Sequence, residues 1–81
     1  MIIEVHSKEG CPKCVEAKAW LTARHHAFTE IRHDDDAERS VFYDTLNLTG
    51  NERTMPQIII CAEGERIRVA GGCDGLPISG L

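Results

Sequence analysis

Two cysteines separated by two residues are the feature of this chain most able to do chemistry. They are Cys11 and Cys14, in the segment 9-EGCPKCVEAKAWL-21. A Cys-x-x-Cys pair occurs in zinc sites, which need two further ligands nearby, and in redox-active dithiols. Eleven residues separate the other cysteines, Cys61 and Cys73, which is not the spacing of a second ligand pair. The spacing therefore favours a redox dithiol, and we expect no bound metal.

The elements around the pair place Cys11 at the start of a helix. Ile2 to His6 is rich in β-branched residues and predicts a strand that ends shortly before the pair. Pro12 suits the first helical position, where a missing N–H leaves no hydrogen bond unmade. Cys14, Ala17 and Leu21 recur at helical spacing and predict the buried side of the helix. The thiol of Cys14 is therefore expected to be the less accessible of the two.

A helix N-terminus is a favourable place for an anionic sulfur. Its free N–H groups and partial positive charge stabilise a thiolate, so the pKa of the Cys11 thiol is expected to fall into the range of about 3.5–7.5. Lys8 and Lys13 add positive charge nearby. We therefore predict that Cys11 attacks a disulfide and that Cys14 resolves the resulting mixed disulfide by attacking Cys11.

A second strand and a second helix are predicted downstream of this helix. Residues 27–32 predict the strand, and Asp35 with Glu38 resembles a capping box at the start of the helix. The expected apolar side of this helix is Ala37, Val41, Phe42 and Leu46, and its expected end is Gly50.

The last third of the chain predicts a hairpin and a short helical turn. Residues 57–61 are apolar after Gln57, as in a strand covered on both faces. After a turn at residues 63–65, Ile67 and Val69 alternate with arginines, as in a half-buried antiparallel partner. Asp74 is expected to cap the final turn. The order β-α-β-α-β-β-short α predicts a single α/β domain over residues 1–81, with a four-stranded mixed sheet and helices on its faces.

Composition excludes several classes of function. With 81 residues, 42% of them hydrophobic, the chain can form one small core. Its net charge of -4 argues against nucleic acid or an anionic membrane as a partner. We find no apolar run long enough to span a membrane and no signal peptide. A cytoplasmic location is therefore expected, where four cysteines point to redox or metal chemistry rather than structural disulfides.

Three motifs taken together resemble the glutaredoxin family, which has the thioredoxin-like fold. They are CPKC at 11–14, TMP at 54–56 and GGCDGL at 71–76. The family pattern is a CPxC active site, a T-V-P loop and a G-G-x-D-[DE]-L segment, in this order. The resemblance spans nearly the whole chain and implies a short member of the family. It implies a thiol–disulfide oxidoreductase that uses glutathione as a co-substrate and holds no bound cofactor.

The resemblance also implies a glutathione site. From the residues alone, a proline before a buried strand is equally an ordinary strand start. In the family, Pro56 would be a cis proline, and the backbone of Met55 would pair with the cysteinyl part of glutathione. Asp74 and its neighbours would hold the γ-glutamyl end, while Lys8 and Arg53 would face the glycyl carboxylate. The residues expected to contact glutathione are Lys8, Pro12, Lys13, Arg53, Thr54, Met55, Pro56, Gly72, Cys73 and Asp74.

The sequence departs from the family pattern beside the first cysteine. Lys13 stands where tyrosine is common, which removes an aromatic wall beside glutathione and adds a charge. The resemblance implies a monomer acting on disulfide-containing or glutathionylated proteins, with a ribonucleotide reductase as an electron acceptor by analogy.

Two other functions stay open at this point. One is an electron carrier reduced by a thioredoxin reductase, which would have less use for Lys8, Arg53 and Asp74. The other is a module that binds a [2Fe–2S] cluster between two protomers through Cys11 and glutathione. Pro12 argues against the cluster, because cluster-binding relatives often have glycine there.

Overall fold

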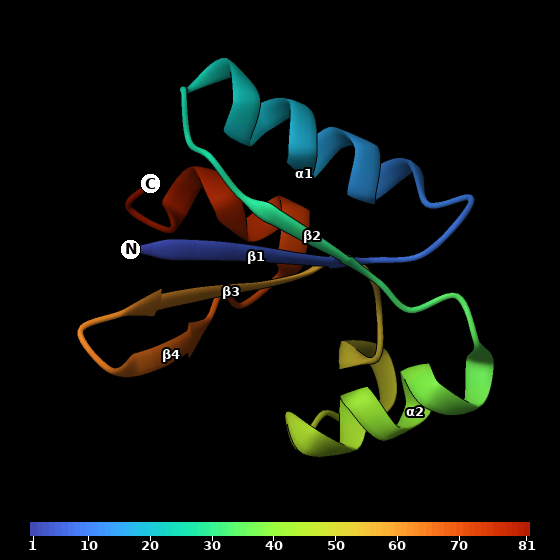
Figure 1. Ribbon diagram of the computed structural model, residues 1–81. Coiled ribbons are helices and arrows are strands. Elements are labelled where there is room, and N and C mark those ends of the chain that lie inside the picture. Colours follow the sequence, from blue (N-terminus) through green and yellow to red (C-terminus); the bar gives the residue numbers. More distant parts are fainter.

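The computed structural model describes residues 1–81 and contains one four-stranded sheet with helices on both sides (Figure 1). In chain order its elements are β1 (Ile2–Ser7), α1 (Pro12–Ala23), β2 (Thr29–Arg32), α2 (Asp36–Thr45), the short 3₁₀ helix η1 (Gly50–Glu52), β3 (Gln57–Ala62), β4 (Glu65–Arg68) and the 3₁₀ helix η2 (Gly72–Ile78). The strand order is β2-β1-β3-β4. The β1–β2 pair is parallel, and the other two pairs are antiparallel. The predicted thioredoxin-like α/β fold is confirmed.

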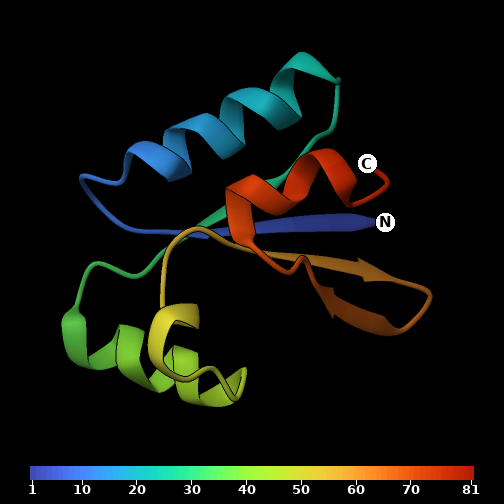
Figure 2. The ribbon, with the colours of Figure 1, turned by 180° about the vertical axis from the view of Figure 1, so that it is seen from behind.

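The sheet separates two layers of helix. α1 and η2 lie on one side and α2 on the other, as the views from the front and from behind both show (Figures 1 and 2). The main core fills the space beneath α1 and η2, and it consists of Ile3, Val5, Ala17, Leu21, Ile58, Val69 and Leu76. Figure 2 also shows that the two termini lie at the end of the sheet opposite the loop that leads into α1. None of the helices combines the length and apolar character that a membrane crossing requires.

Helix α1 begins as the sequence predicts. Cys11 is its N-cap residue and Pro12 occupies the first turn, while Cys14, Ala17 and Leu21 are buried. Trp20 is partly buried and packs against the core from the same helix. One side of α1 is thereby fixed to the sheet, and this contact holds the start of the helix at the end of β1.

Helix α2 differs from the prediction in its end and its buried side. Asp35 does accept a hydrogen bond from the Glu38 N–H at 2.8 Å, but the Glu38 carboxylate turns to His33. The helix ends at Thr45 rather than at Gly50, because the chain reverses at Asn47, whose φ is 56°.

The prediction for the apolar side of α2 is correct for two of its four residues and wrong for the other two. Phe42 and Leu46 pack inward together with Tyr43, but Val41 is 61% exposed and Ala37 is exposed as well. At 100° per residue, Ala37 and Val41 lie on the side of the helix opposite to these three residues. The prediction had therefore combined two opposite sides of one helix.

The hairpin is less covered than its sequence indicates. Gln57, Ile58 and Ile59 are buried, but the rest of β3 is only partly buried. Ile67 pairs with Ile60 and is 54% exposed, so the predicted half-buried alternation fails at this residue. The physical reason is that β4 is the edge strand, and the end of the hairpin projects beyond the helices (Figure 1).

Candidate active site

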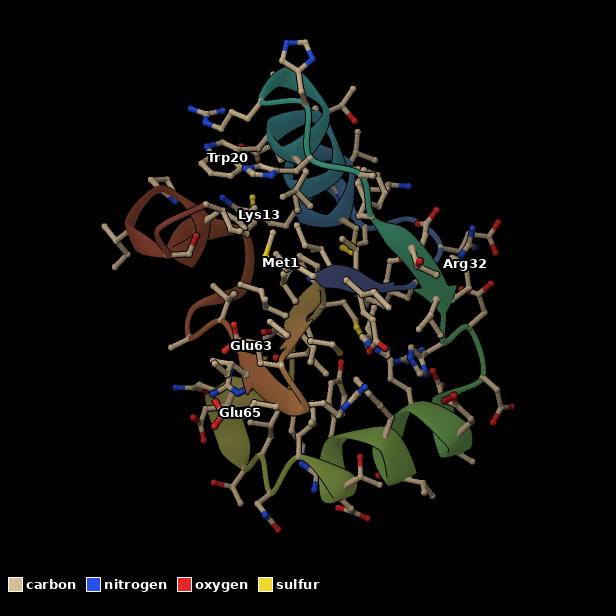
Figure 3. The ribbon with its side chains drawn as sticks, turned by 60° about the vertical axis from the view of Figure 1, so that its left-hand side comes forward. Met1, Lys13, Trp20, Arg32, Glu63 and Glu65 are labelled. Atoms are coloured by element: carbon tan, nitrogen blue, oxygen red, sulfur yellow. A yellow bond between two sulfur atoms is a disulfide. The ribbon has the colours of Figure 1, made fainter.

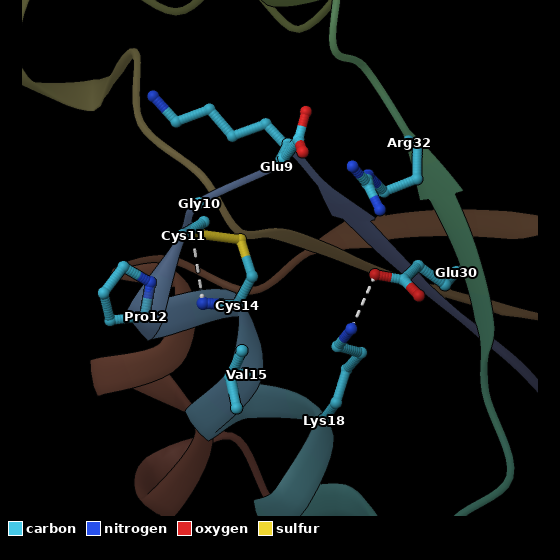
Figure 4. A pocket seen from close by; sticks show the side chains of 10 residues that line it. Glu9, Gly10, Cys11, Pro12, Cys14, Val15, Lys18, Glu30 and Arg32 are labelled. Atoms are coloured by element: carbon cyan, nitrogen blue, oxygen red, sulfur yellow. Dashed lines mark hydrogen bonds and ion pairs between the residues drawn. A yellow bond between two sulfur atoms is a disulfide. The ribbon is translucent and has the colours of Figure 1, made fainter.

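The Cys11–Cys14 pair lies at the junction of β1 and α1 and forms a disulfide bond. Cys11 is 9% exposed and Cys14 is 2% exposed. The Cys14 N–H donates a hydrogen bond to Cys11 Sγ at 3.1 Å, so this sulfur is the acceptor that caps the helix (Figure 4). After reduction, the same N–H and the helix N-terminus stabilise a thiolate on Cys11. The geometry therefore favours Cys11 as the attacking sulfur and the more buried Cys14 as the resolving one.

The loop before β3 brings a backbone segment next to the disulfide. The Met55–Pro56 peptide bond is cis, as predicted, and the Met55 carbonyl oxygen lies 3.6 Å from Cys11 Sγ. Met55 is buried in a small cluster with both cysteines, Tyr43 and Leu48. No backbone hydrogen bond uses the N–H or the C=O of Met55. An extended peptide can therefore pair with Met55 as an added strand would, directly beside the sulfur.

Close packing of η2 against this loop completes a groove. Gly72 has a φ of 57°, and a Cβ atom built on it would lie 2.7 Å from the Pro56 carbonyl oxygen. Only glycine combines that backbone conformation with so close an approach. The resulting groove, the Met55 groove, has a volume of about 250 Å³ and is lined by Lys13, Thr54, Met55, Pro56, Gly71, Gly72, Cys73 and Asp74. All of these except Gly71 are among the residues expected to contact glutathione.

Asp74 does not cap η2, contrary to the prediction. The N-cap residue is Gly71, and Asp74 lies within the first turn of η2. Its carboxylate oxygen instead accepts a hydrogen bond from Lys13 Nζ at 3.0 Å, across the groove. This bond is the first cause of a raised pKa for the Lys13 ammonium. The prediction failed because it considered only contacts local in sequence, and the partner of Asp74 is on α1.

A second groove, of about 460 Å³, is lined by both cysteines and by residues of α1 and β2 (Figure 4). It holds two further predicted residues, Lys8 and Pro12. The sequence analysis missed Lys18, Glu30 and Arg32, which also line it. A signal for Lys18 was available, since it lies one helical turn after Cys14.

Glu30 is the centre of the polar contacts in this second groove. It accepts hydrogen bonds from Lys18 Nζ at 2.8 Å and from Ser7 Oγ at 2.7 Å. The Lys18 bond, followed by the Ser7 bond, lowers the pKa of the Glu30 carboxyl. Glu30 is therefore a paired anion, and its contacts join α1 to β2 beside Cys14.

Arg53 is the one predicted residue that lines neither groove. Its guanidinium donates to the Leu48 carbonyl oxygen at 2.8 Å and forms an ion pair with Asp44. It also contacts Ser40 at 3.3 Å and lies over the Tyr43 ring. The structure thus places Arg53 between α2 and the loop before Met55, where it fixes the loop to α2 and does not line either groove.

The two remaining cysteines, Cys61 and Cys73, are free and half-buried. Burial raises the pKa of the Cys73 thiol, which keeps Cys73 protonated near neutral pH although it lines the Met55 groove. No three His, Cys, Asp or Glu side chains are grouped in a way that could hold a metal ion. Of the four thiols, those of the Cys11–Cys14 pair are the ones placed for disulfide exchange.

The sequence matches the family model described as Glutaredoxin over residues 3–67. The chain belongs to the glutaredoxin family. Glutaredoxin 3 of Escherichia coli (strain K12) is 34% identical over 74 residues, which cover 91% of this chain and 80% of that protein. Glutaredoxin 1 of Rickettsia conorii (strain ATCC VR-613 / Malish 7) is 34% identical over 76 residues, covering 91% of this chain and 67% of the relative.

A solved structure gives the same result for the fold. The crystal structure of glutaredoxin 1 from Francisella tularensis, complexed with cacodylate, superposes with a TM-score of 0.72 and 36% identity. The superposition covers 95% of this chain and 88% of that one. This glutaredoxin is a thiol–disulfide oxidoreductase, with Cys11 and Cys14 as its CxxC pair.

Proposed function

We propose that this glutaredoxin reduces protein disulfides and glutathione mixed disulfides through Cys11, with glutathione as its co-substrate. The observation that carries the proposal is the unpaired Met55 backbone, whose carbonyl oxygen lies 3.6 Å from Cys11 Sγ at the mouth of the Met55 groove. A thiol peptide that pairs with Met55 brings its own sulfur to Cys11. Glutathione is such a peptide.

The groove offers complementary groups for the γ-glutamyl end of glutathione. In η2 the Gly72 N–H donates to Val69, whereas the N–H groups of Cys73 and Asp74 have no backbone acceptor. These two N–H groups suit the γ-glutamyl carboxylate, and the Asp74 carboxylate suits the ammonium.

The glycyl end of glutathione is assigned to the opposite side of Cys11. Lys8 is exposed and forms no ion pair, so its ammonium is free to meet the glycyl carboxylate. Arg53 would have to leave Asp44 and Leu48 to do the same. We therefore propose Lys8, rather than Arg53, as the partner of this carboxylate.

The chemistry needs no group beyond the thiols. The Cys11 thiolate attacks the glutathione sulfur of a mixed disulfide, so a Cys11–glutathione disulfide forms and the substrate leaves as a thiolate that takes a proton. A second glutathione thiolate then attacks the glutathione sulfur bound to Cys11. Oxidised glutathione leaves, and the Cys11 thiolate is restored.

Cys14 opens the second route, which serves protein disulfides. Its thiolate attacks the Cys11 sulfur of a mixed disulfide and releases the reduced protein. The product is the Cys11–Cys14 disulfide present in the structure. Two glutathione molecules return this disulfide to the dithiol and become oxidised glutathione.

The proposal is tested by the turnover of a small glutathione mixed disulfide, with glutathione, glutathione reductase and NADPH in excess. Wild type and Cys14→Ser should both be active, Cys11→Ser should be inactive, and Cys61→Ser serves as the matched control. With a protein disulfide as substrate, Cys14→Ser should lose activity. Inactive wild type, with the reductase shown to work, would refute glutathione dependence.

Two further parts belong to the proposal. A ribonucleotide reductase is the electron acceptor by analogy with the family, and the protein is a monomer acting in the cytoplasm, where glutathione is kept reduced. Deoxyribonucleotide formation by a purified reductase, with this protein and glutathione as electron source, tests the first. If wild type is inactive with glutathione but active with thioredoxin reductase and NADPH, the carrier function replaces the proposal. Visible absorbance of the purified protein would support the cluster-binding module.

A further inference from the structure

Lys13 spans the Met55 groove from the start of α1 to η2. Its ammonium lies 3.0 Å from Asp74 Oδ1 and 3.5 Å from Glu16 Oε2. Figure 3 shows Lys13 on the side of α1 that faces η2. The carboxylate that the proposed function assigns to the ligand's ammonium is therefore already occupied by an ammonium of the protein itself.

We propose that Lys13 is a specificity-determining residue that competes with the ligand's α-ammonium for Asp74. The consequence is a broadened substrate class: γ-glutamyl thiols whose amine is acylated or absent are accepted almost as well as glutathione. The inference rests on the proposed function, because it concerns the γ-glutamyl end of the Met55 groove.

Charge balance makes the two ammonium groups competitors. One carboxylate offsets one positive charge, and a second ammonium brought to Asp74 is repelled by the first at a few ångströms. The Lys13 side chain is 54% exposed and that of Asp74 is 76% exposed. An exposed ion pair of this kind is weak, so an incoming ammonium can displace Lys13 but gains less than it would from a free carboxylate.

Glu16 gives the displaced Lys13 a second partner. It lies three residues along α1, and its side chain is 64% exposed. When a ligand ammonium takes Asp74, Lys13 can keep its pairing with Glu16 and need not become an unpaired cation. Glu16 therefore makes displacement easier, so its removal should act in the opposite direction to the removal of Lys13.

The test compares two substrates that differ only at the amine: a mixed disulfide of glutathione with a small thiol, and its N-acetyl counterpart. The readout is the ratio of their KM values in wild type, Lys13→Gln, Glu16→Gln and Asp74→Asn. A change at Lys13 also alters the charge beside Cys11, but its effect on the reactivity of the Cys11 thiolate is common to both substrates and cancels in the ratio. A merely structural role for Lys13 would not move the ratio.

We expect Lys13→Gln to lower KM for the free-amine substrate by about two- to fivefold, as an exposed ion pair allows, without the same gain for the N-acetyl substrate. Glu16→Gln should raise KM for the free-amine substrate. Asp74→Asn should make the two substrates alike. In wild type the preference for the free amine should be small, and it should be largest in Lys13→Gln.

Two results would overturn the inference, and each is distinct from a failure of the proposed function. An unchanged ratio in Lys13→Gln would show that Lys13 does not compete for Asp74. A higher KM for both substrates in that variant would show that Lys13 binds a ligand carboxylate instead. If wild type turns over neither substrate, glutathione dependence itself is wrong.

Discussion

The two faces of the sheet are built from the same strands but from different kinds of residue. The face beneath α1 and η2 receives Ile3 and Val5 of β1, which pair with Ile60 and Ile58 of β3. These side chains join Leu21 and others in the aliphatic core. Packing on this face is apolar and non-directional, as in most small domains.

The face toward α2 receives the alternate residues of β1, which are Ile2 and two polar residues. Glu4 and His6 lie here, and both His6 and His33 are buried. His6 Nε2 lies 2.9 Å from Glu4, His6 Nδ1 lies 2.8 Å from His33 Nε2, and His33 Nδ1 lies against Glu38 of α2. The Phe42 ring stacks on both imidazoles. The sheet is thus joined to α2 by a row of hydrogen bonds between two carboxylates.

The number of protons on the two imidazoles limits how many hydrogen bonds this row can form. It contains three hydrogen bonds, and two neutral imidazoles supply only two N–H groups. The row is therefore complete only when it holds one further proton. Burial lowers the pKa of His6, so the His6 ring holds a proton less readily than a free imidazole does. A directional row of this kind specifies one position of α2, whereas the aliphatic face mainly adds stability.

The difference between the faces bears on the active site, because the cysteines touch both. α1 is fixed by the aliphatic face and presents the CxxC pair. The cysteines also pack with Met55, Leu48 and Tyr43 on the side of α2. The two faces therefore have different roles. Packing on the aliphatic face stabilises the fold, and the hydrogen bonds on the polar face fix the position of α2, whose Tyr43 belongs to the cluster around Cys11.

The largest effect is expected on the aliphatic face. Leu21→Ala removes a fully buried side chain and should lower the free energy of unfolding by about 2–5 kcal/mol, a large part of a small domain's stability. Val15→Ala on the same helix, where the side chain is 63% exposed, is the control and should change it by less than about 0.5 kcal/mol. Urea unfolding measures both. Equal losses would contradict the assignment of this face as the core.

The histidine row should give the next largest effect. His6→Leu or His33→Leu alone leaves a buried ring nitrogen of the partner without its hydrogen bond, at a cost of about 1–3 kcal/mol. The double variant should lose less than the sum of the single losses, because neither ring nitrogen is then left unpaired. Strictly additive losses, measured by the same unfolding experiment, would show that the two rings are not coupled.

Lowering the pH should have a smaller effect on the free energy of unfolding. Folding lowers the pKa of His6 below its ordinary value of 6.5. The His6 imidazole therefore binds a proton more readily in the unfolded chain than in the folded chain. The His6 contribution is therefore present above about pH 6.5 and is lost as the pH falls to the folded-state pKa. The loss is about 1.4 kcal/mol for each pKa unit of lowering. Unfolding of wild type and His6→Gln between pH 7.5 and 5 should show a weaker pH dependence in the variant; identical slopes would remove His6 as the cause.

The smallest effect is expected at the polar rim of the aliphatic face. Lys18→Met keeps the aliphatic stem but removes the ion pair with Glu30. The Lys18 and Glu30 side chains are each about one-third exposed. Stability should fall by less than about 1 kcal/mol. A double-variant cycle with Glu30→Gln isolates the pair. A coupling well above 1 kcal/mol would mean that polar contacts stabilise both faces alike, and the contrast between them would fail.

Features with local causes were predictable from the sequence. Pro12 and the spacing of Cys14, Ala17 and Leu21 identify α1, and alternating strand and helix patterns give the order of elements. The TMP and GGCDGL motifs locate the groove, since the approach of Gly72 to Pro56 depends on glycine itself.

Features that depend on distant partners were not predictable. His6 and His33 are 27 positions apart, and nothing local shows that one ring meets the other. Lys13 and Asp74 meet only because α1 and η2 share one side of the sheet. Arg53 precedes the TMP motif, yet α2 and the Leu48 carbonyl oxygen take its guanidinium. In each case the tertiary structure decides among several partners that the sequence leaves equivalent.

The most direct test of the central claim is the mass of the Cys14→Ser protein after exposure to oxidised glutathione. The Cys11 thiolate should attack the disulfide, form a bond to one glutathione sulfur and release the other glutathione as a thiolate. We predict one glutathione per chain, mapped by peptide analysis to Cys11, at a rate that Cys61→Ser does not change. An adduct at Cys61 or Cys73 with Cys11 unmodified would contradict the account.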